Sequence, residues 1–517
     1  MVNALADRPA PLTAALGTRQ PLSTARRAAA FGVLAFLVSF AGSWIPSFWG
    51  DEAASVMSAE RPLPSLFAML RTVDAVHGSY YLLLHFWIDL FGAGPLSVRL
   101  PSAIAVGLAA AGTVVLAEWL FSRRIAIITG VVCALLPRFT YMGAEARSYA
   151  LSTAAAVWLT VLLVRLLIRR NTRRLAWLGY GVGLALCIYL FLYLVLLAIV
   201  HGILVLTTYR ARTVLRRWSA ATALGIVLAG PLIAFAIGER HQIEFLAHRH
   251  RVSFGLVVFG QWFGGAWLGI LCWALILVAC AAAARSWWTT RNLPKSPAVS
   301  GWRGYPSGMV LLLCWLVAPT TILLVGNAGL QPMYTNRYLS FCAPAAAILV
   351  ALGIAALPRN WARITALLAF VALVVPGYIA QRTEFGKPGG SDWAKVSEVI
   401  GQNAKPGDAI VFDQSVKASW RPRLAMHLYP GDYKGLDDVA LLTPFDQTSG
   451  LWDAVAPLAT VQERLATVSK VWALETTLSH ESAANSDLHV LERDGFGVAQ
   501  RIRINRTIIY EFTRSTP

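Results

Sequence analysis

Residues 28–52 read AAAFGVLAFLVSFAGSWIPSFWGDE, and this stretch decides the fold class of the chain. Its first 18 residues carry no charge and are long enough to cross a bilayer as a helix. Two adjacent carboxylates, Asp51 and Glu52, follow where that helix is expected to leave the membrane. Charged side chains beside lipid are costly, so they are usually retained for chemistry, ion handling or pairing. The plainer alternative is an interfacial charge or a cap of the next helix.

The composition extends this pattern over most of the chain. The 517 residues are 56% hydrophobic and 14% charged, which is typical of a polytopic membrane protein. The net charge of +18 comes from short Arg and Lys clusters between apolar runs, not from one basic groove. Such clusters mark cytoplasmic loops under the positive-inside rule, so the charge does not indicate nucleic-acid binding.

Eleven apolar runs are predicted to cross the membrane, with the N-terminus inside and the C-terminus outside. They are 28–46, 99–121, 125–142, 149–168, 175–190, 193–208, 219–237, 263–284, 308–325, 338–357 and 363–380. The run 80–90 is shorter, carries His85 and Asp89, and is predicted to lie in the membrane interface. Leaving it out places every basic cluster on the inner side, as the positive-inside rule requires.

Three parts of the chain are predicted: a cytoplasmic tail (1–27), a transmembrane domain (28–380) and an extracytoplasmic α/β domain (381–517). In the last part we expect helices at 392–403, behind an N-cap, and at 457–466. Strands are expected at 409–412, 470–474, 496–504 and 507–512, the last two forming a hairpin. Asp408, Asp413 and His427 are expected to be caps and surface residues.

Polar residues gather in the loops predicted to lie outside, at 44–99, 143–148, 239–261 and 327–337. They include Asp51, Glu52, His77, Arg99, Glu145, Arg147, His241, His248, His250, Tyr334 and Arg337. The three arginines run against the positive-inside bias. Each can snorkel or pair with a carboxylate. Together they favour an anionic ligand, because a guanidinium is a fixed fork of donors that suits phosphate.

Five segments occur in order along the chain: WGDEA, HGSYYLLLHFW, SVRLPSAI, MGAEARSYAL and TNRYLSFCAP. Together they resemble the bacterial membrane glycosyltransferases of the GT-C superfamily, near family 39. That group includes protein O-mannosyltransferases and the aminoarabinose transferases of lipid A. The resemblance covers residues 28–380 and implies a GT-C-like, helical polytopic membrane protein with a polyprenyl-phosphate sugar as donor.

The resemblance also implies roles for single residues. Asp51 takes the acidic catalytic position, with Glu52 as its partner. His77 matches the histidine of the family's His-Pro-Pro-Leu segment, although Gly78 and Ser79 replace the prolines here. Arg147 and Tyr149 match the family's second external loop, and Arg337 and Tyr338 match its late external loop. From these matches and from the other polar residues of the external loops, the donor phosphate is assigned to Arg99, Arg147 and Arg337. The remaining substrate contacts are assigned to His77, Glu145, Tyr149, Tyr334 and Tyr338.

The residue types suit this chemistry. Transfer from a polyprenyl-phosphate sugar needs a base for the acceptor hydroxyl, which Asp51 can supply. It also needs cations for the departing phosphate, which Arg147 and Arg337 can supply. With no covalent intermediate, the anomeric centre inverts. Mannose is the first expectation and arabinofuranose the second, with a lipid, glycan or protein acceptor outside the plasma membrane.

Metal use and two other functions stay open. Asp51, Glu52, His77 and Glu145 are residue types that hold a divalent cation, but no ligand spacing supports a metal. A transporter or flippase of lipid-linked sugars would also need arginines, but it predicts inverted repeats, and none is seen. A non-catalytic GT-C-like scaffold is disfavoured by the intact acidic pair.

Overall fold

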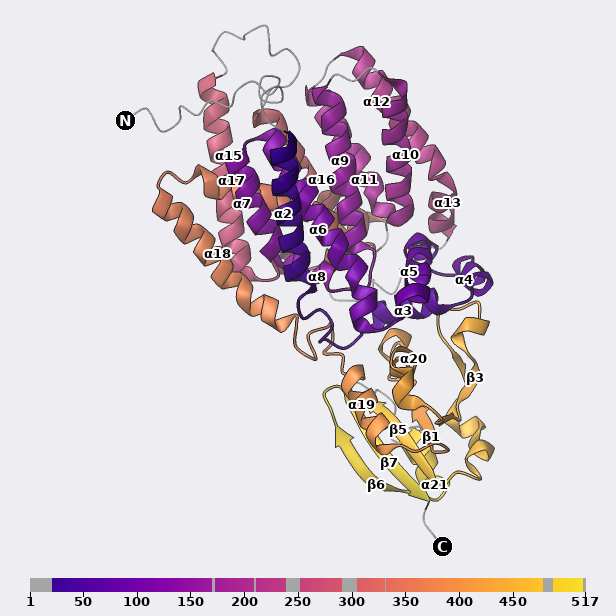
Figure 1. Cartoon of the computed structure of the whole chain (residues 1–517). Helices are drawn as coiled ribbons and strands as arrows, with labels where there is room; N and C mark the ends of the chain where they lie inside the picture. The colour runs from indigo at the N-terminus through magenta and orange to yellow at the C-terminus, as the bar shows by residue number, and fades with distance from the viewer. Residues whose placement is uncertain are drawn as a thin grey trace. The chain divides into compact units, whose positions relative to one another are not determined.

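The computed structural model describes residues 21–169, 173–208, 211–238, 252–290, 305–330, 332–477 and 487–514. The chain forms two compact units (Figure 1). The first, here called the helical unit, comprises Met1–Ala41 and Leu100–Ile379. The second, here called the mixed unit, comprises Gly42–Arg99 and Ala380–Pro517. The first external segment therefore groups with the C-terminal residues, while the domain boundaries drawn from the sequence stay a prediction.

The helical unit is built from helices joined by turns, and the boundary between the units falls within α6. Its α-helices are α2 (Pro21–Phe40), α6 (Pro95–Leu120), α7 (Arg123–Leu135), α8 (Pro137–Gly143), α9 (Tyr149–Ile168), α10 (Arg174–Leu190), α11 (Leu196–Thr208), α12 (Arg212–Leu228), α13 (Gly230–Gly238), α14 (Gln261–Phe263), α15 (Ala266–Thr290), α16 (Tyr305–Gly329), α17 (Ala343–Ala356) and α18 (Asn360–Ala380). A π-helix, η5 (Leu256–Gly260), precedes α14, and the 3-10 segments η3 (Leu192–Val195) and η7 (Asn336–Cys342) precede α11 and α17.

Seven helices in the described ranges are long and apolar enough to cross a membrane, or nine if two bent pairs each count as one span. The bends are 54° between α7 and α8 and 51° between α12 and α13. Pro137 and Pro231 stand at these breaks, where proline removes a helical hydrogen bond. There are also two shorter apolar helices, Arg174–Leu190 and Leu192–Thr208. With these two, each of the eleven predicted runs corresponds to a helix or a bent pair of helices.

One detail of the predicted topology is confirmed and a second stays a prediction. The run 80–90 corresponds to α5 (Gly78–Phe91), which is not among the helices long enough to span a membrane, while its place in the membrane interface stays a prediction. The apolar stretch 175–208 breaks at Phe191, between α10 and η3, so it is not one long span. Which end of the unit faces the cytoplasm stays a prediction of the positive-inside rule.

Small residues let helices of this unit approach closely. A Cβ on Gly181 of α10 would lie 2.5 Å from the carbonyl oxygen of Ala221 in α12. One on Gly353 of α17 would collide with the backbone of Leu275 in α15. In a bilayer, helices associate through close backbone packing, because apolar side chains gain little free energy by moving from lipid into a protein interface.

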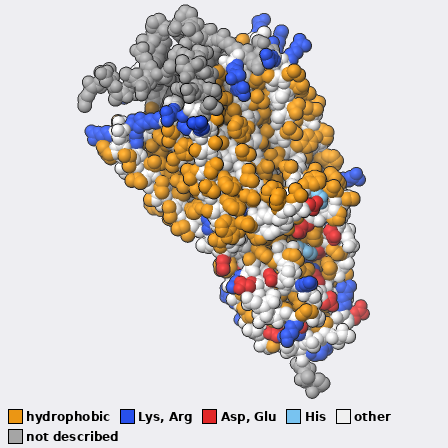
Figure 2. Space-filling view, in the orientation of Figure 1, with side chains coloured by type: hydrophobic (Ala, Val, Ile, Leu, Met, Phe, Trp, Pro, Cys, Tyr) orange, Lys and Arg blue, Asp and Glu red, His pale blue; other side chains and the backbone are white. Residues whose placement is uncertain are grey.

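The surface of the helical unit suits a lipid environment. Figure 2 shows apolar side chains over much of its visible face, and large exposed ones include Trp158, Leu186, Val227, Leu277 and Leu368. Lys and Arg side chains gather toward the end where α7, α12 and α18 begin. We call this the basic end. An apolar belt with clustered cations at one end is the pattern of a polytopic membrane protein.

The mixed unit combines helices from two parts of the chain with a small sheet. Its helices are α3 (Gly50–Glu60), α4 (Leu63–Leu70), α5, α19 (Trp393–Asn403), α20 (Leu424–Leu428) and α21 (Asp487–Arg493). The sheet has the order β2-β1-β5-β7-β6, formed by β1 (Ala409–Phe412), β2 (Asp437–Asp438), β5 (Lys470–Thr476), β6 (Phe496–Arg503) and β7 (Thr507–Arg514). Strand β1 pairs parallel with β2 and β5, and β7 pairs antiparallel with β5 and β6. A separate pair joins β3 (Leu441–Thr443) to β4 (Ala454–Val455).

The main C-terminal elements agree with the sequence. Strand β1 covers the predicted 409–412, and it is apolar and buried along its whole length. The predicted strand 470–474 lies within β5, and the closing hairpin is formed by β6 and β7. The predicted helix 457–466 is wrong, because only the 3-10 turns Leu458–Thr460 and Gln462–Leu465 form there.

Two aspartates of this unit have other roles than expected. Asp392 precedes α19 but makes no capping hydrogen bond to it. Its carboxylate instead accepts hydrogen bonds from the backbone N–H groups of Asn505, Arg506 and Thr507, at the hairpin turn. Asp413, expected at the surface, is buried and accepts from the backbone and hydroxyl of Thr476. Both carboxylates satisfy backbone N–H groups of distant segments, Asp392 at the hairpin turn and Asp413 at the end of β5.

Candidate functional site

The acidic pair lies in the first turn of α3, in the mixed unit. Asp51 is half-buried, whereas Glu52 is fully buried. Carboxylates are favoured at a helix N-terminus, where the unpaired N–H groups carry partial positive charge. Gly50 precedes the pair because a Cβ there would collide with the carbonyl oxygen of Ser419. The motif WGDE therefore combines a close backbone contact with one accessible and one enclosed carboxylate.

Arg99 holds Glu52 in a buried, forked ion pair. Its Nε and Nη2 donate to the two carboxylate oxygens over 2.7 Å each, and both side chains are fully buried. Its remaining N–H groups donate to the carbonyl oxygens of Ser43, Pro46 and Ser47. All five guanidinium donors of Arg99 are therefore in use.

Lys387 brings a second cation to the same carboxylate. Its Nζ lies 3.5 Å from Oε1 of Glu52, and the side chain is buried. One enclosed carboxylate thus faces two enclosed cations, and it ties the first external segment to residues beyond 380. These contacts favour a positioning role for Glu52 and Arg99, because a guanidinium with five occupied donors has none left for a phosphate.

His77 lies in the same unit, at the start of α5. The side chain is buried, and its ring centroid lies 5.9 Å from that of Tyr81. Asp74, three residues earlier, has a positive φ of 59° and accepts a hydrogen bond of 2.8 Å from the Tyr81 hydroxyl. Asp tolerates this left-handed conformation better than most residues. The turn Asp74–His77 is therefore held in one shape, although it lacks the prolines of the family segment.

The second and the late external loop meet in the helical unit. Glu145 and Arg147 lie in the turn between α8 and α9, and Arg337 lies in η7. Nη1 of Arg337 is 3.8 Å from Oε1 of Glu145, which is fully buried. The hydroxyl of Ser102 donates to the carbonyl oxygen of Arg147, which fixes the turn to α6. Two arginines and one carboxylate from distant parts of the sequence are thereby brought to one end of this unit.

Four aromatic rings pack together in this unit, two of them on residues that are close in sequence to Arg147 and Arg337. Tyr149 and Tyr338, both predicted site residues, have ring centroids 6.4 Å apart. Phe191 and Tyr193, from the break between α10 and α11, pack against Tyr338 at 5.8 and 5.2 Å. Neither Phe191 nor Tyr193 was predicted as a site residue, and both stand where the predicted runs 175–190 and 193–208 meet.

A further polar group links α8, α14 and the late external loop. Nε of Arg138 donates to the carbonyl oxygen of Gln261 over 2.6 Å, and the hydroxyl of Tyr334 donates to the side chain of Gln261 over the same distance. Burial raises the pKa of Tyr334 to about 12, against the opposing effect of Arg138, so this hydroxyl stays protonated and donating. Arg138 and Gln261 were missed as site residues. An arginine within an apolar run was the available signal for Arg138.

The predicted site residues therefore form two sets, one in each unit. Asp51, Glu52, His77 and Arg99 belong to the mixed unit, and Glu145, Arg147, Tyr149, Tyr334, Arg337 and Tyr338 belong to the helical unit. The histidines at 241, 248 and 250 lie outside the described residues. In the described ranges, no three His, Cys, Asp or Glu side chains are grouped so as to hold a metal ion.

Comparisons with known proteins bear on the family. A family model described as dolichyl-phosphate-mannose-protein mannosyltransferase matches residues 77–235. No curated protein matches the sequence significantly. Among solved structures, ArnT from Cupriavidus metallidurans bound to undecaprenyl phosphate is similar over 93% of this chain and 97% of its own, with a TM-score of 0.56 and 13% identity. Arabinofuranosyltransferase AftD from Mycobacteria is similar over 95% of this chain and 40% of its own, with a TM-score of 0.51 and 16% identity.

At these identities the structural likeness establishes the fold, and the family model adds support for a membrane glycosyltransferase. The apolar helices and the small C-terminal sheet agree with the fold class expected from the sequence. The chain is a helical, polytopic membrane protein whose fold is similar to those of ArnT and AftD, and its residues 77–235 match the dolichyl-phosphate-mannose-protein mannosyltransferase model.

Proposed function

We propose that this chain transfers a sugar from a polyprenyl-phosphate donor to an acceptor outside the plasma membrane, with inversion. The observation that carries the proposal is its similarity, over 93% of its length, to an ArnT structure that holds undecaprenyl phosphate. The name of the matching family model, which specifies dolichyl-phosphate mannose, supports a donor of the same class. That name also makes mannose the first choice of sugar. The similarity to an arabinofuranosyltransferase keeps arabinofuranose as the second.

The roles follow from the residue types and their surroundings. Asp51 is the more accessible carboxylate of the acidic pair, which suits a base that must reach an acceptor hydroxyl. Arg147 and Arg337 are the cations for the departing phosphate, and Glu145 orients Arg337. Because a phosphate leaving group needs no protonation, no second acid is required.

Glu52 and Arg99 act through Asp51 in this proposal. Their buried pair fixes the start of α3 and with it the direction of the neighbouring carboxylate. His77, Tyr149, Tyr334 and Tyr338 remain proposed substrate contacts. The acceptor is a hydroxyl of a lipid, glycan or protein, and the transfer assay described below identifies which.

The proposal is tested by incubating the purified protein with labelled polyprenyl-phosphate mannose or arabinofuranose and crude membrane acceptors. Transfer of label from one of these donors is expected. Movement of the labelled lipid across vesicles without transfer would contradict the proposal and favour a flippase.

Lysine substitution tests the two arginines proposed to hold the phosphate. Arg147→Lys and Arg337→Lys keep the charge but lose the forked donors, so each is expected to weaken transition-state stabilisation by about 2–4 kcal/mol. The measurement is kcat/KM for the donor in both variants. Arg359→Lys, an exposed substitution at the basic end, is the matched control and should leave kcat/KM unchanged. Full activity in Arg147→Lys and Arg337→Lys would assign both arginines to structure.

The proposed orientation has its own test. Asp89, Leu330 and Val498 are exposed and lie on segments predicted to be outside, so cysteines placed there should react with an impermeant thiol reagent in intact cells. The native cysteines are replaced first. Cysteines at 171 and 302, predicted inside, are the controls and should react only after lysis. The opposite pattern would invert the topology and move the proposed chemistry to the cytoplasm.

A further inference from the structure

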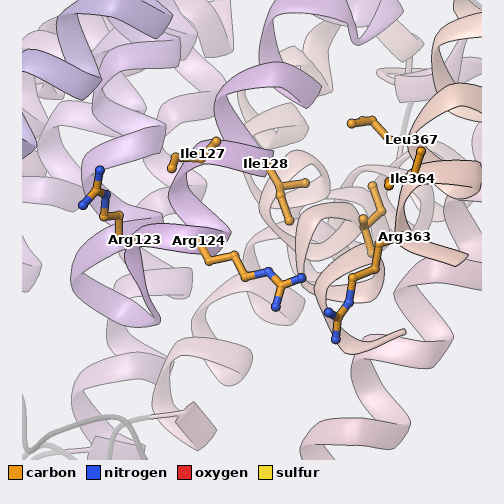
Figure 3. Close-up of a pocket in the computed structure, with 8 residues that line it drawn as sticks. Arg123, Arg124, Ile127, Ile128, Arg363, Ile364 and Leu367 are labelled. Carbon is orange, nitrogen blue, oxygen red and sulfur yellow. The ribbon is translucent and has the colours of Figure 1, made fainter. Parts of the chain in front are cut away.

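A cavity of about 580 Å³ opens at the basic end of the helical unit (Figure 3). It lies among α7, α17 and α18, and no residue of the proposed catalytic set lines it. Three arginines line it: Arg123 and Arg124 at the start of α7, and Arg363 at the start of α18. Its volume falls in the range of about 300–1,000 Å³ that is typical of ligand pockets.

The charges of this cavity favour an anion. Figure 3 shows the guanidinium groups of Arg124 and Arg363 pointing toward one another from opposite walls. No ion pair joins Arg123, Arg124 or Arg363 to a carboxylate within the described ranges, and the guanidinium of Arg363 donates to the amide oxygen of Asn360. Like charges that face one another across a cavity repel, and an anion bound between them would relieve this repulsion. The helices α7 and α18 begin here and favour an anion with their N-termini, while α17 ends here and opposes them, so the arginines supply most of the positive potential.

The chain itself offers little to neutralise these arginines. Glu118, near the end of α6, is engaged by Arg27 and Thr24, with 2.5 Å from Nη2 of Arg27 to the carboxylate. The segment 1–20 holds a single acidic residue, Asp7, against two arginines, and 291–304 holds none. An anion at this cavity is therefore expected to come from outside the chain.

The walls of the cavity and the surface beside it are apolar. Ile128, Ile354 and Leu367 line the cavity between the arginines. Ile364, which also lines the cavity, is 59% exposed, and Trp361 on the same helix is 62% exposed, which suits contact with lipid tails and the membrane interface. A soluble anion would use the arginines alone. A molecule with a phosphate on an aliphatic body would use both surfaces.

We propose that this cavity is a binding site for an anionic phospholipid of the leaflet at the basic end. The phosphodiester lies between Arg124 and Arg363, with Arg123 at its rim, and an acyl chain lies along the aliphatic side chains of α7, α17 and α18. Basic pockets between membrane helices are suited to such headgroups, because Coulomb attraction and burial of the chain act together. The site is separate from the proposed sugar transfer and does not depend on it.

The test uses native mass spectrometry of the full-length protein in detergent, titrated with phosphatidylglycerol or, for comparison, phosphatidylcholine. Arg124→Gln/Arg363→Gln is expected to weaken phosphatidylglycerol binding about 30-fold, from the usual contribution of two basic side chains near a lipid surface. Arg212→Gln/Arg216→Gln removes the same charge from exposed positions of α12 at the same end and should bind like the wild type. Ile128→Trp fills the cavity without changing charge and should also lose the lipid.

Three outcomes would overturn the proposal. The first is an equal loss of phosphatidylglycerol binding in both double variants, which would show that only the net charge of the protein matters. The second is equal binding of phosphatidylcholine, which would show no selection for an anionic headgroup. The third is displacement of the lipid by millimolar inorganic phosphate in the wild type with undiminished binding in Ile128→Trp, which would make the ligand a soluble anion. Arg124→Gln alone, at an exposed position, serves if the double variant does not fold.

Discussion

Replacing Asp51 by asparagine is expected to lower sugar transfer by about 10²–10⁴-fold while donor binding survives. The amide keeps the shape of the carboxylate but cannot take the proton of the acceptor hydroxyl. Donor affinity is expected to hold or rise, because the phosphate is assigned to arginines and the variant removes a negative charge. Transfer and donor binding are measured side by side on the purified variant.

Asp89→Asn is the matched control for this experiment. It makes the same chemical change in the same unit, on a side chain that is 62% exposed and lies 3.7 Å from His85. Transfer and binding should both be unchanged in it. Loss of transfer and binding together in Asp51→Asn would mean that the carboxylate holds structure or a metal. A transporter gives no reason for intact binding with lost transfer, so the expected split also separates the two functions.

Replacing Glu52 by glutamine is expected to destabilise the protein by about 3–5 kcal/mol. The change leaves Arg99 and Lys387 buried without the carboxylate that faces both of them. Unpaired charges in a buried site cost far more than the ion pair itself contributes. The measurement is the unfolding free energy in mild detergent, compared with that of the wild type.

Glu398→Gln is the control for this prediction, because Glu398 forms an exposed ion pair with Lys395 in the same unit. Little change in stability is expected there. The double variant Glu52→Gln/Lys387→Gln removes one of the two stranded cations and should recover part of the loss. Unchanged stability together with lost transfer in Glu52→Gln would assign this residue to the chemistry instead of to the support of α3.

Hydropathy along the sequence determined where the helices of the membrane domain lie. Inside a bilayer every backbone N–H and C=O must be hydrogen-bonded within the same segment, so an apolar run of sufficient length has one solution. The run 80–90 was separated from the spans by its length and its charges, and the gap between the runs 175–190 and 193–208 coincides with the observed break at Phe191. Strand β1 and the β6–β7 hairpin could also be predicted from local sequence. An apolar run specifies β1, and a turn at Asn505 specifies the hairpin.

Where partners are distant in sequence, local patterns failed. The segment 457–466 reads as a helix, but only two 3-10 turns form there. Asp392 stands where a cap is expected, but its carboxylate serves a hairpin turn more than one hundred positions later. Asp413 is enclosed in the same way. Each carboxylate accepts hydrogen bonds from N–H groups that come close to it only after folding. The position of the aspartate in the sequence does not show which groups these are.

The sequence by itself determined the class of the protein and named the charged residues worth attention. Only the tertiary structure decided which of those charges are already paired. Arg99, Arg147 and Arg337 look alike as isolated external arginines, but Arg99 is enclosed with all five donors used, while Arg337 stands 3.8 Å from one carboxylate. The physical reason is that the energy of a charge depends on its burial and on its nearest counter-charge, and both are set by segments that meet only after folding.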